Sequence, residues 1–276
     1  MSLEENNESL FDQKGRRIPF SGMRVFNEDS LSYYKISKSS YNFQEILKNS
    51  KKFADVDGSI ELDSFESTCI DLKENLENDP LLKNLFTGVH VPFICPKRDQ
   101  EIDLGVELEK ITLPSVAASF KSSFPELHCK ATLQGSSKLE GELSIDENSR
   151  YESFLEAQSK GVLVGWYFPQ ALQEFDIESQ RAQMKNLPMY KNLILSGTLD
   201  TSAALVGSPN LLVNINDYPP VLCLSAIKHS DDRLMLCFKA YGQHLEFWCM
   251  SQMLTPGQKQ VSEQWSGGLT LFAAIE

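Results

Sequence analysis

Three apolar segments near the end of the chain decide the fold: VLCLSAIK (Val221–Lys228), RLMLCFKA (Arg233–Ala240) and HLEFWCM (His244–Met250). Each segment has the length and the apolar content of a β-strand. Only short polar stretches separate them, namely residues 229–232 and 241–243. Because short turns join neighbouring antiparallel strands, the sequence predicts a three-strand antiparallel meander.

Alternation along the third segment assigns its residues to two faces. His244, Glu246 and Trp248 share one face, while Leu245, Phe247 and Cys249 share the other. We therefore expect Cys249 to be buried and His244 to be more exposed. A His-x-Glu pair on one face can serve as a ligand pair or an acid/base couple, which makes His244 and Glu246 candidate ligand-binding residues. A half-exposed polar face with a tryptophan explains the same pattern.

A nearly continuous apolar run at 161–168 predicts a central strand that is buried on both faces. The run ends in Trp166, Tyr167 and Phe168, followed by Pro169. An aromatic cluster at a strand end can line a pocket or anchor a partner, so these three residues are candidate ligand-binding residues. Aromatic side chains of this kind also commonly form the core.

Around this strand the patterns predict a mixed main domain over residues 89–276. The expected elements are a strand at 89–95, a hairpin of 126–134 with 138–145, helices at 150–158 and 170–186, strands at 193–199 and 211–215, and a closing strand at 268–275.

The first third of the chain has a different character. Residues 1–40 form a polar, loosely ordered lead-in, and residues 41–88 carry helical spacing around an Asp-Gly turn. The second helix of this unit is expected to open at Asp63 and a third at Asp79-Pro80. The predicted fold class is therefore α+β, with a small N-terminal helical unit packed on a mostly antiparallel sheet.

The Asp-Gly turn, FADVDGSIELDSF at 53–65, resembles the calcium loop of an EF-hand. With Gly58 at loop position six, Asp55 and Asp57 fall on ligand positions three and five. Phe53 and Ser64, however, stand where the two end ligands belong. About half of a coordination shell is lost, so we expect no metal and a structural turn here.

Cys95 is the best candidate nucleophile in the sequence. It ends a strand and precedes Lys97 and Arg98, whose charges favour a thiolate. His128 or His90 would supply the base of a cysteine-dependent hydrolase or transferase. The other interpretation is an ordinary cysteine at a strand end. A histidine nitrogen beside the sulfur would distinguish the two.

Composition narrows the classes of function. The formal net charge of -12 makes nucleic acid a poor partner, and no apolar stretch reaches the length of a membrane span. The first residues lack the apolar core of a Sec signal peptide, and six scattered cysteines suit reduced thiols, so we expect a cytoplasmic location. Common nucleotide-binding, α/β-hydrolase and zinc-protease motifs are missing.

These observations favour a non-enzymatic interaction module without a cofactor, whose partner is a protein or a small apolar ligand. The acidic, signal-free character would also suit a bacterial protein delivered directly into host cells. The alternative is the cysteine-dependent enzyme that uses Cys95 and His128.

Overall fold

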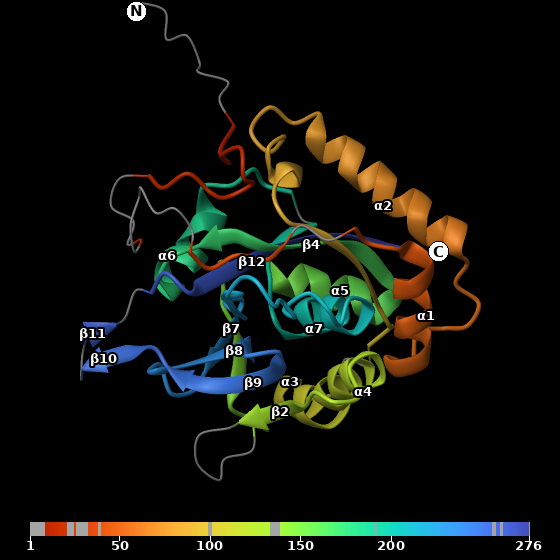
Figure 1. Ribbon diagram of the computed structural model, residues 1–276. Helices are drawn as coiled ribbons and strands as arrows, with labels where there is room; N and C mark the ends of the chain where they lie inside the picture. Colours follow the sequence, from red (N-terminus) through yellow and green to blue (C-terminus); the bar gives the residue numbers. More distant parts are fainter. Residues whose placement is uncertain are drawn as a thin grey trace, which may run out of the picture.

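The computed structural model describes residues 9–20, 25, 33–37, 40–98, 101–132, 139–190, 192–255, 258–259 and 262–275. Its centre is an eight-stranded mixed sheet (Figure 1). Across the sheet the strands run β1 (Val91–Cys95), β4 (Leu163–Gln173), β12 (Trp265–Ala274), β6 (Val221–Cys223), β8 (Leu234–Tyr241), β9 (His244–Ser251) and β2 (Cys129–Thr132), and β5 (Leu193–Leu195) also pairs with β12. Two small ribbons pair β3 (Leu143–Ile145) with β7 (Ile227–His229) and β10 (Met253–Thr255) with β11 (Gln258–Lys259).

Helices cover both faces of the central strands. In Figure 1, α2 lies on one side of β4 and β12, while α5 and α7 lie on the other. The α-helices are α1 (Phe43–Phe53), α2 (Leu62–Glu77), α3 (Leu104–Glu107), α4 (Leu113–Ser123), α5 (Tyr151–Lys160), α6 (Ile177–Ala182) and α7 (Thr198–Gly207). Short 3₁₀ helices occur at Leu85–Thr87 and Gln183–Lys185, and a π-helical turn occurs at Leu108–Thr112. The α+β class is thereby confirmed.

The core is built around β4, which is buried along its whole length. Trp166 lies on the α2 side, where its Nε1 donates a hydrogen bond of 2.7 Å to the carbonyl of Cys69. Gly165 permits the close approach of the neighbouring strand, because a Cβ there would stand 1.9 Å from the carbonyl oxygen of Leu271. The predicted central strand is confirmed, and β12 is its central neighbour rather than a closing edge.

The meander predicted from the C-terminal segments is confirmed as the antiparallel order β6, β8, β9. The two faces of β9 also differ as expected, since Cys249 is 3% exposed while His244 is half-buried. The first predicted strand is split, however. It leaves the sheet after Cys223, and its second part pairs with β3 as β7.

The hairpin expected at 126–145 is a wrong prediction. β2 pairs in parallel with β9, and β3 pairs antiparallel with β7, so the two segments belong to different sheets. Alternation identified the strands but carried no information about their partners. The segment expected to join them lies largely outside the described residues.

Three further expectations differ from the structure. The helix expected at 170–186 begins only at Ile177, because β4 continues to Gln173 through its pairing with β12. The strand expected at 193–199 ends at Leu195 and is followed by the buried helix α7, whereas 211–215 forms no strand. The helix expected at Asp79-Pro80 is a series of turns leading into the 3₁₀ helix. In these segments, contacts with distant parts of the chain determined the secondary structure more strongly than the local spacing of apolar residues.

No helix in the described part of the chain is long and apolar enough to span a membrane.

Candidate functional site

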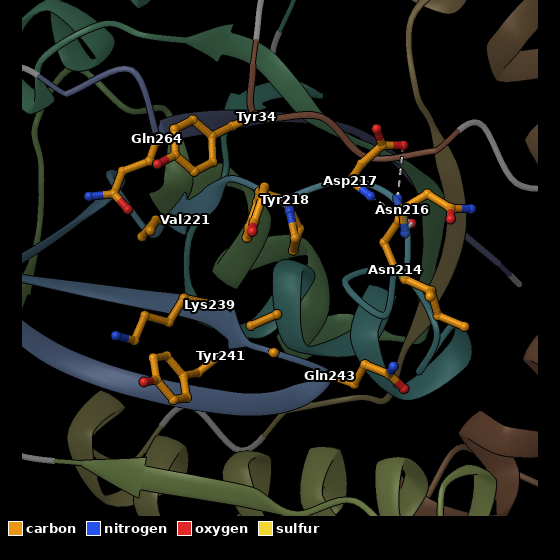
Figure 2. A pocket seen from close by; sticks show the side chains of 14 residues that line it. Tyr34, Asn214, Asn216, Asp217, Tyr218, Val221, Lys239, Tyr241, Gln243 and Gln264 are labelled. Carbon is orange, nitrogen blue, oxygen red and sulfur yellow. Dashed lines mark hydrogen bonds between the residues drawn. The ribbon is translucent and has the colours of Figure 1, made fainter.

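An open pocket of about 620 Å³ with a partly polar lining lies at one end of the meander (Figure 2). One wall is Tyr34, which belongs to a short segment, residues 33–37, that we call the strap. The other walls are residues 214–219, the end of β8 with the turn that follows it (239–243), and Gln264. We call this cavity the strap pocket. Figure 2 shows Tyr34 and Gln264 along one side and Lys239 and Tyr241 along the other.

Two buried glutamines at the end of β4 hold the strap in place. Gln170 accepts a hydrogen bond of 3.0 Å from the backbone N–H of Ile36, and Gln173 donates one of 2.6 Å to the carbonyl of Tyr34. The two amides also bond to each other. Because buried amides must be satisfied, these bonds fix the position of Tyr34 at the pocket wall.

The second wall is tied to the strap by hydrogen bonds and one ion pair. The backbone N–H of Lys35 donates to the carbonyl of Tyr218 at 2.9 Å, and the Lys35 Nζ lies 3.1 Å from an oxygen of Asp217. Tyr218 precedes Pro219, which favours an extended backbone. Asn214 donates to Asp217 at 3.2 Å. The hydrogen bond from Lys35 lowers the pKa of Asp217, so this carboxylate is ionised and already paired.

Lys239, the lysine that lines the pocket, is likewise paired with other side chains of the protein. The Nζ of Lys239 lies 3.8 Å from the ring centroid of Trp248 and 3.9 Å from an oxygen of Glu246. The Trp248 Nε1 donates to the same oxygen at 2.7 Å. The sequence-predicted Glu246 and His244 therefore lie on the same sheet face as Lys239 and Tyr241, their cross-strand partners. They flank the pocket without lining it.

The remaining polar groups of the pocket are uncommitted. The side-chain amides of Asn216, Gln243 and Gln264 form no hydrogen bond to any part of the chain that the structure describes, nor do the hydroxyls of Tyr34, Tyr218 and Tyr241. Tyr218 and Tyr241 are 63% and 72% exposed. The pocket thus offers aromatic faces together with uncharged donors and acceptors.

Cys95 is placed in a different environment from a catalytic thiol. It is 3% exposed, and its sulfur accepts a hydrogen bond of 3.0 Å from the Gln158 amide. Arg98 does not face the thiol as a free cation, because its Nε pairs with Glu107 at 2.5 Å. Burial raises the pKa of Cys95 well above its ordinary value, which keeps the thiol protonated at neutral pH.

The histidines proposed as the base lie in other surroundings. His128 stacks on His244 with ring centroids 3.7 Å apart, and its backbone N–H donates to the Nδ1 of that histidine. His90 is buried against Phe86 and Trp166, with its Nδ1 2.9 Å from the carbonyl of Gly88. The hydrogen-bond partner that the Cys95 sulfur does have is the amide of Gln158, which is not a base.

This difference in environment predicts the order of thiol modification. Cys129 is half-buried, and burial raises its pKa to about 11, whereas the other five cysteines are buried. Iodoacetamide should therefore modify Cys129 first and Cys95 only on unfolding, as followed by peptide mass spectrometry over time. Native modification of Cys95 ahead of Cys129 would restore the catalytic hypothesis.

Trp166, Tyr167 and Phe168 are each at most 1% exposed. Trp166 and Phe168 contact Phe86 and His90 on the α2 side of the sheet. Tyr167 points to the opposite side, where its ring would contact a Cβ added at Gly268. The three residues lie in the core, and none lines the strap pocket.

The Asp-Gly turn joins α1 to α2. Asp55 adopts a left-handed backbone conformation with φ of 54°, and Asp57 accepts a hydrogen bond of 2.8 Å from the N–H of Ser59. The ammonium of Lys51 bonds to the carbonyls of Gly58 and Ile60 at 2.8 and 2.7 Å, so a resident cation already uses two oxygens of the loop. Among the described residues, no group of three or more potential metal-ligating side chains comes together.

Two smaller cavities lie elsewhere in the described part of the chain. A groove of about 310 Å³ between α4 and β2 is mainly apolar and has Phe247 at its base. A cavity of about 50 Å³ lies beside Cys95 and Gln158. Neither combines exposed aromatic rings with uncommitted polar groups as the strap pocket does.

Two stretches of the sequence that line or border the strap pocket contain tyrosine, but the spacing of apolar residues does not reveal that they lie close together. Two tyrosines at 33–34 and the stretch Asp217-Tyr218-Pro219-Pro220 are conspicuous, but they are distant in the chain. Only the folded structure brings them together, through the bridge between Tyr34 and Tyr218.

Comparison with protein families, with curated proteins and with solved structures finds no match to this chain.

Proposed function

We propose that this protein is a non-enzymatic interaction module and that it binds an uncharged segment of a protein partner in the strap pocket. The observation that carries the proposal is the convergence of Tyr34, Tyr218 and Tyr241 from three separate segments, with three uncommitted amides between them. Tyrosine is enriched at the energetically important positions of protein interfaces, because it combines a large apolar area with a low entropic cost of ordering, and side-chain amides add adaptable hydrogen bonding in antibody binding loops.

The charges of the pocket support an uncharged ligand. Asp217 is paired with Lys35, and Lys239 is held by Glu246 and Trp248. A charged ligand would have to compete with these existing partners. A neutral segment can instead use the free amides and hydroxyls while its side chains cover the tyrosine rings.

The enzyme alternative has less support. It needs an activated thiol with a base in reach, yet the Cys95 sulfur is buried against an amide and its pKa is raised. The polar pocket is lined by other residues, and Cys95 is not among them.

Selection from a displayed library of random peptides tests the proposal. The wild-type protein should enrich a related set of peptides, and Tyr241→Ala should abolish that enrichment by removing an exposed ring of the pocket. Tyr190→Ala is the matched control, since Tyr190 is 43% exposed and does not line the pocket. A wild type that enriches no peptide family, or enrichment that survives Tyr241→Ala, would contradict the proposal.

A further inference from the structure

We infer that the segment bound by the strap pocket is proline-rich and adopts the polyproline II conformation. This inference rests on the proposed function and names the class of ligand for the same site. Polyproline II segments are typically recognised by grooves that are lined with aromatic side chains and flanked by hydrogen-bond donors.

Aromatic rings of the kind that such a ligand contacts gather at the strap and at the pocket that it borders. Tyr33 and Tyr218 are stacked, with centroids 5.5 Å apart and planes 19° apart, and Tyr34 stands edge-on to Tyr33 at 81°. These rings form a ridge that is held by mutual contact and by the strap. Tyr241, the last residue of β8, lines the pocket together with Tyr34 and Tyr218 (Figure 2). The space between upright aromatic rings accommodates the flat face of a pyrrolidine ring.

The hydrogen-bonding groups match the same ligand. Proline has no N–H, and a polyproline II backbone makes no internal hydrogen bonds, so it presents mainly carbonyl acceptors. The pocket can donate from the amides of Asn216, Gln243 and Gln264 and from tyrosine hydroxyls, none of which has another partner in the described chain.

Addition of a β-strand at this place is disfavoured. Such binding would need free backbone groups along the pocket wall. The carbonyl of Tyr218 already accepts the N–H of Lys35, and the carbonyl of Tyr34 accepts from Gln173. Recognition must therefore use side chains. A polyproline II segment suits this mode of binding, because it is already extended and loses little conformational entropy when it binds.

The test is a titration of the 15N-labelled full chain with an oligoproline of about ten residues, roughly 31 Å long in this conformation. A peptide of equal length with alternating glycine and serine is the control ligand. We expect saturable shifts of the side-chain amides of Asn216, Gln243 and Gln264 with oligoproline. Affinity should fall at least about tenfold for the glycine–serine peptide and for Tyr218→Ala, but not for Tyr190→Ala.

The contradicting outcomes separate this inference from the proposed function. If displayed peptides without proline bind the pocket and oligoproline does not, the inference fails while the interaction module stands. Equal binding of both synthetic peptides also overturns the inference. If no peptide binds, or a neutral oligosaccharide alone shifts the same amides, both proposals fail.

Discussion

Replacing Trp166 with alanine should lower the free energy of unfolding by about 3–5 kcal/mol. The side chain is 1% exposed, and it contacts aromatic rings from three segments, including Tyr41, Phe43 and Phe86. Its Nε1 is also bonded to the carbonyl of Cys69, which the change would leave without this donor. Denaturant titration followed by circular dichroism measures the loss.

Tyr241→Ala is the matched control, because this tyrosine is 72% exposed. Its effect on stability should stay within about 0.5 kcal/mol, even though peptide enrichment is lost. A Trp166→Ala variant that is as stable as Tyr241→Ala would contradict the assignment of the aromatic cluster to the core and would return it to the candidates for a binding surface.

Asp200 should make the protein less stable as the pH rises from about 4 to about 6. This carboxyl group is completely buried at the start of α7, where it accepts hydrogen bonds from Tyr151, Thr270 and the N–H of Gly197. Burial outweighs these bonds and raises its pKa to about 6. The unfolded chain has a pKa of about 3.9, so the folded state holds the proton more tightly, and its advantage disappears as the proton leaves.

The measurement is the difference in unfolding free energy between the wild type and Asp200→Asn at a series of pH values. Relative to Asp200→Asn, the wild type should lose about 2–3 kcal/mol of unfolding free energy between pH 4 and pH 7, because asparagine does not ionise. Asp231→Asn should show the opposite sign in a lower pH range, below about pH 4, because Arg233 lowers the pKa of Asp231 to about 2 and the wild type loses this advantage only as the carboxylate is protonated. A wild-type advantage that grows with pH at Asp200 would mean that the hydrogen bonds outweigh burial.

The sequence predicted the parts of the fold that depend on strictly local patterns. Alternation in the C-terminal segments predicted β8 and β9 and the burial of Cys249, and the apolar run at 161–168 predicted β4. Pairing partners were not predictable in the same way. The parallel contact of β2 with β9 and the crossover to β12 depend on contacts between distant segments, which alternation does not encode.

The candidate site was less predictable than the fold for the same reason. Its walls come from the lead-in, from a loop without regular structure and from the β8–β9 hairpin, and these segments are distant from one another in the chain. Glu246 and His244 were predicted because they share a strand face, and they flank the pocket. Tyr34 was not predicted, because its position depends on the buried amides of Gln170 and Gln173.

The location of a bound peptide decides whether the strap pocket is the binding site. A peptide obtained from the displayed library should be added to the 15N-labelled chain and its effects mapped by NMR. The side-chain amides of Asn216, Gln243 and Gln264 should shift on binding, and Tyr241→Ala should remove these shifts. Shifts confined to the apolar groove around Phe247, between α4 and β2, would contradict this prediction.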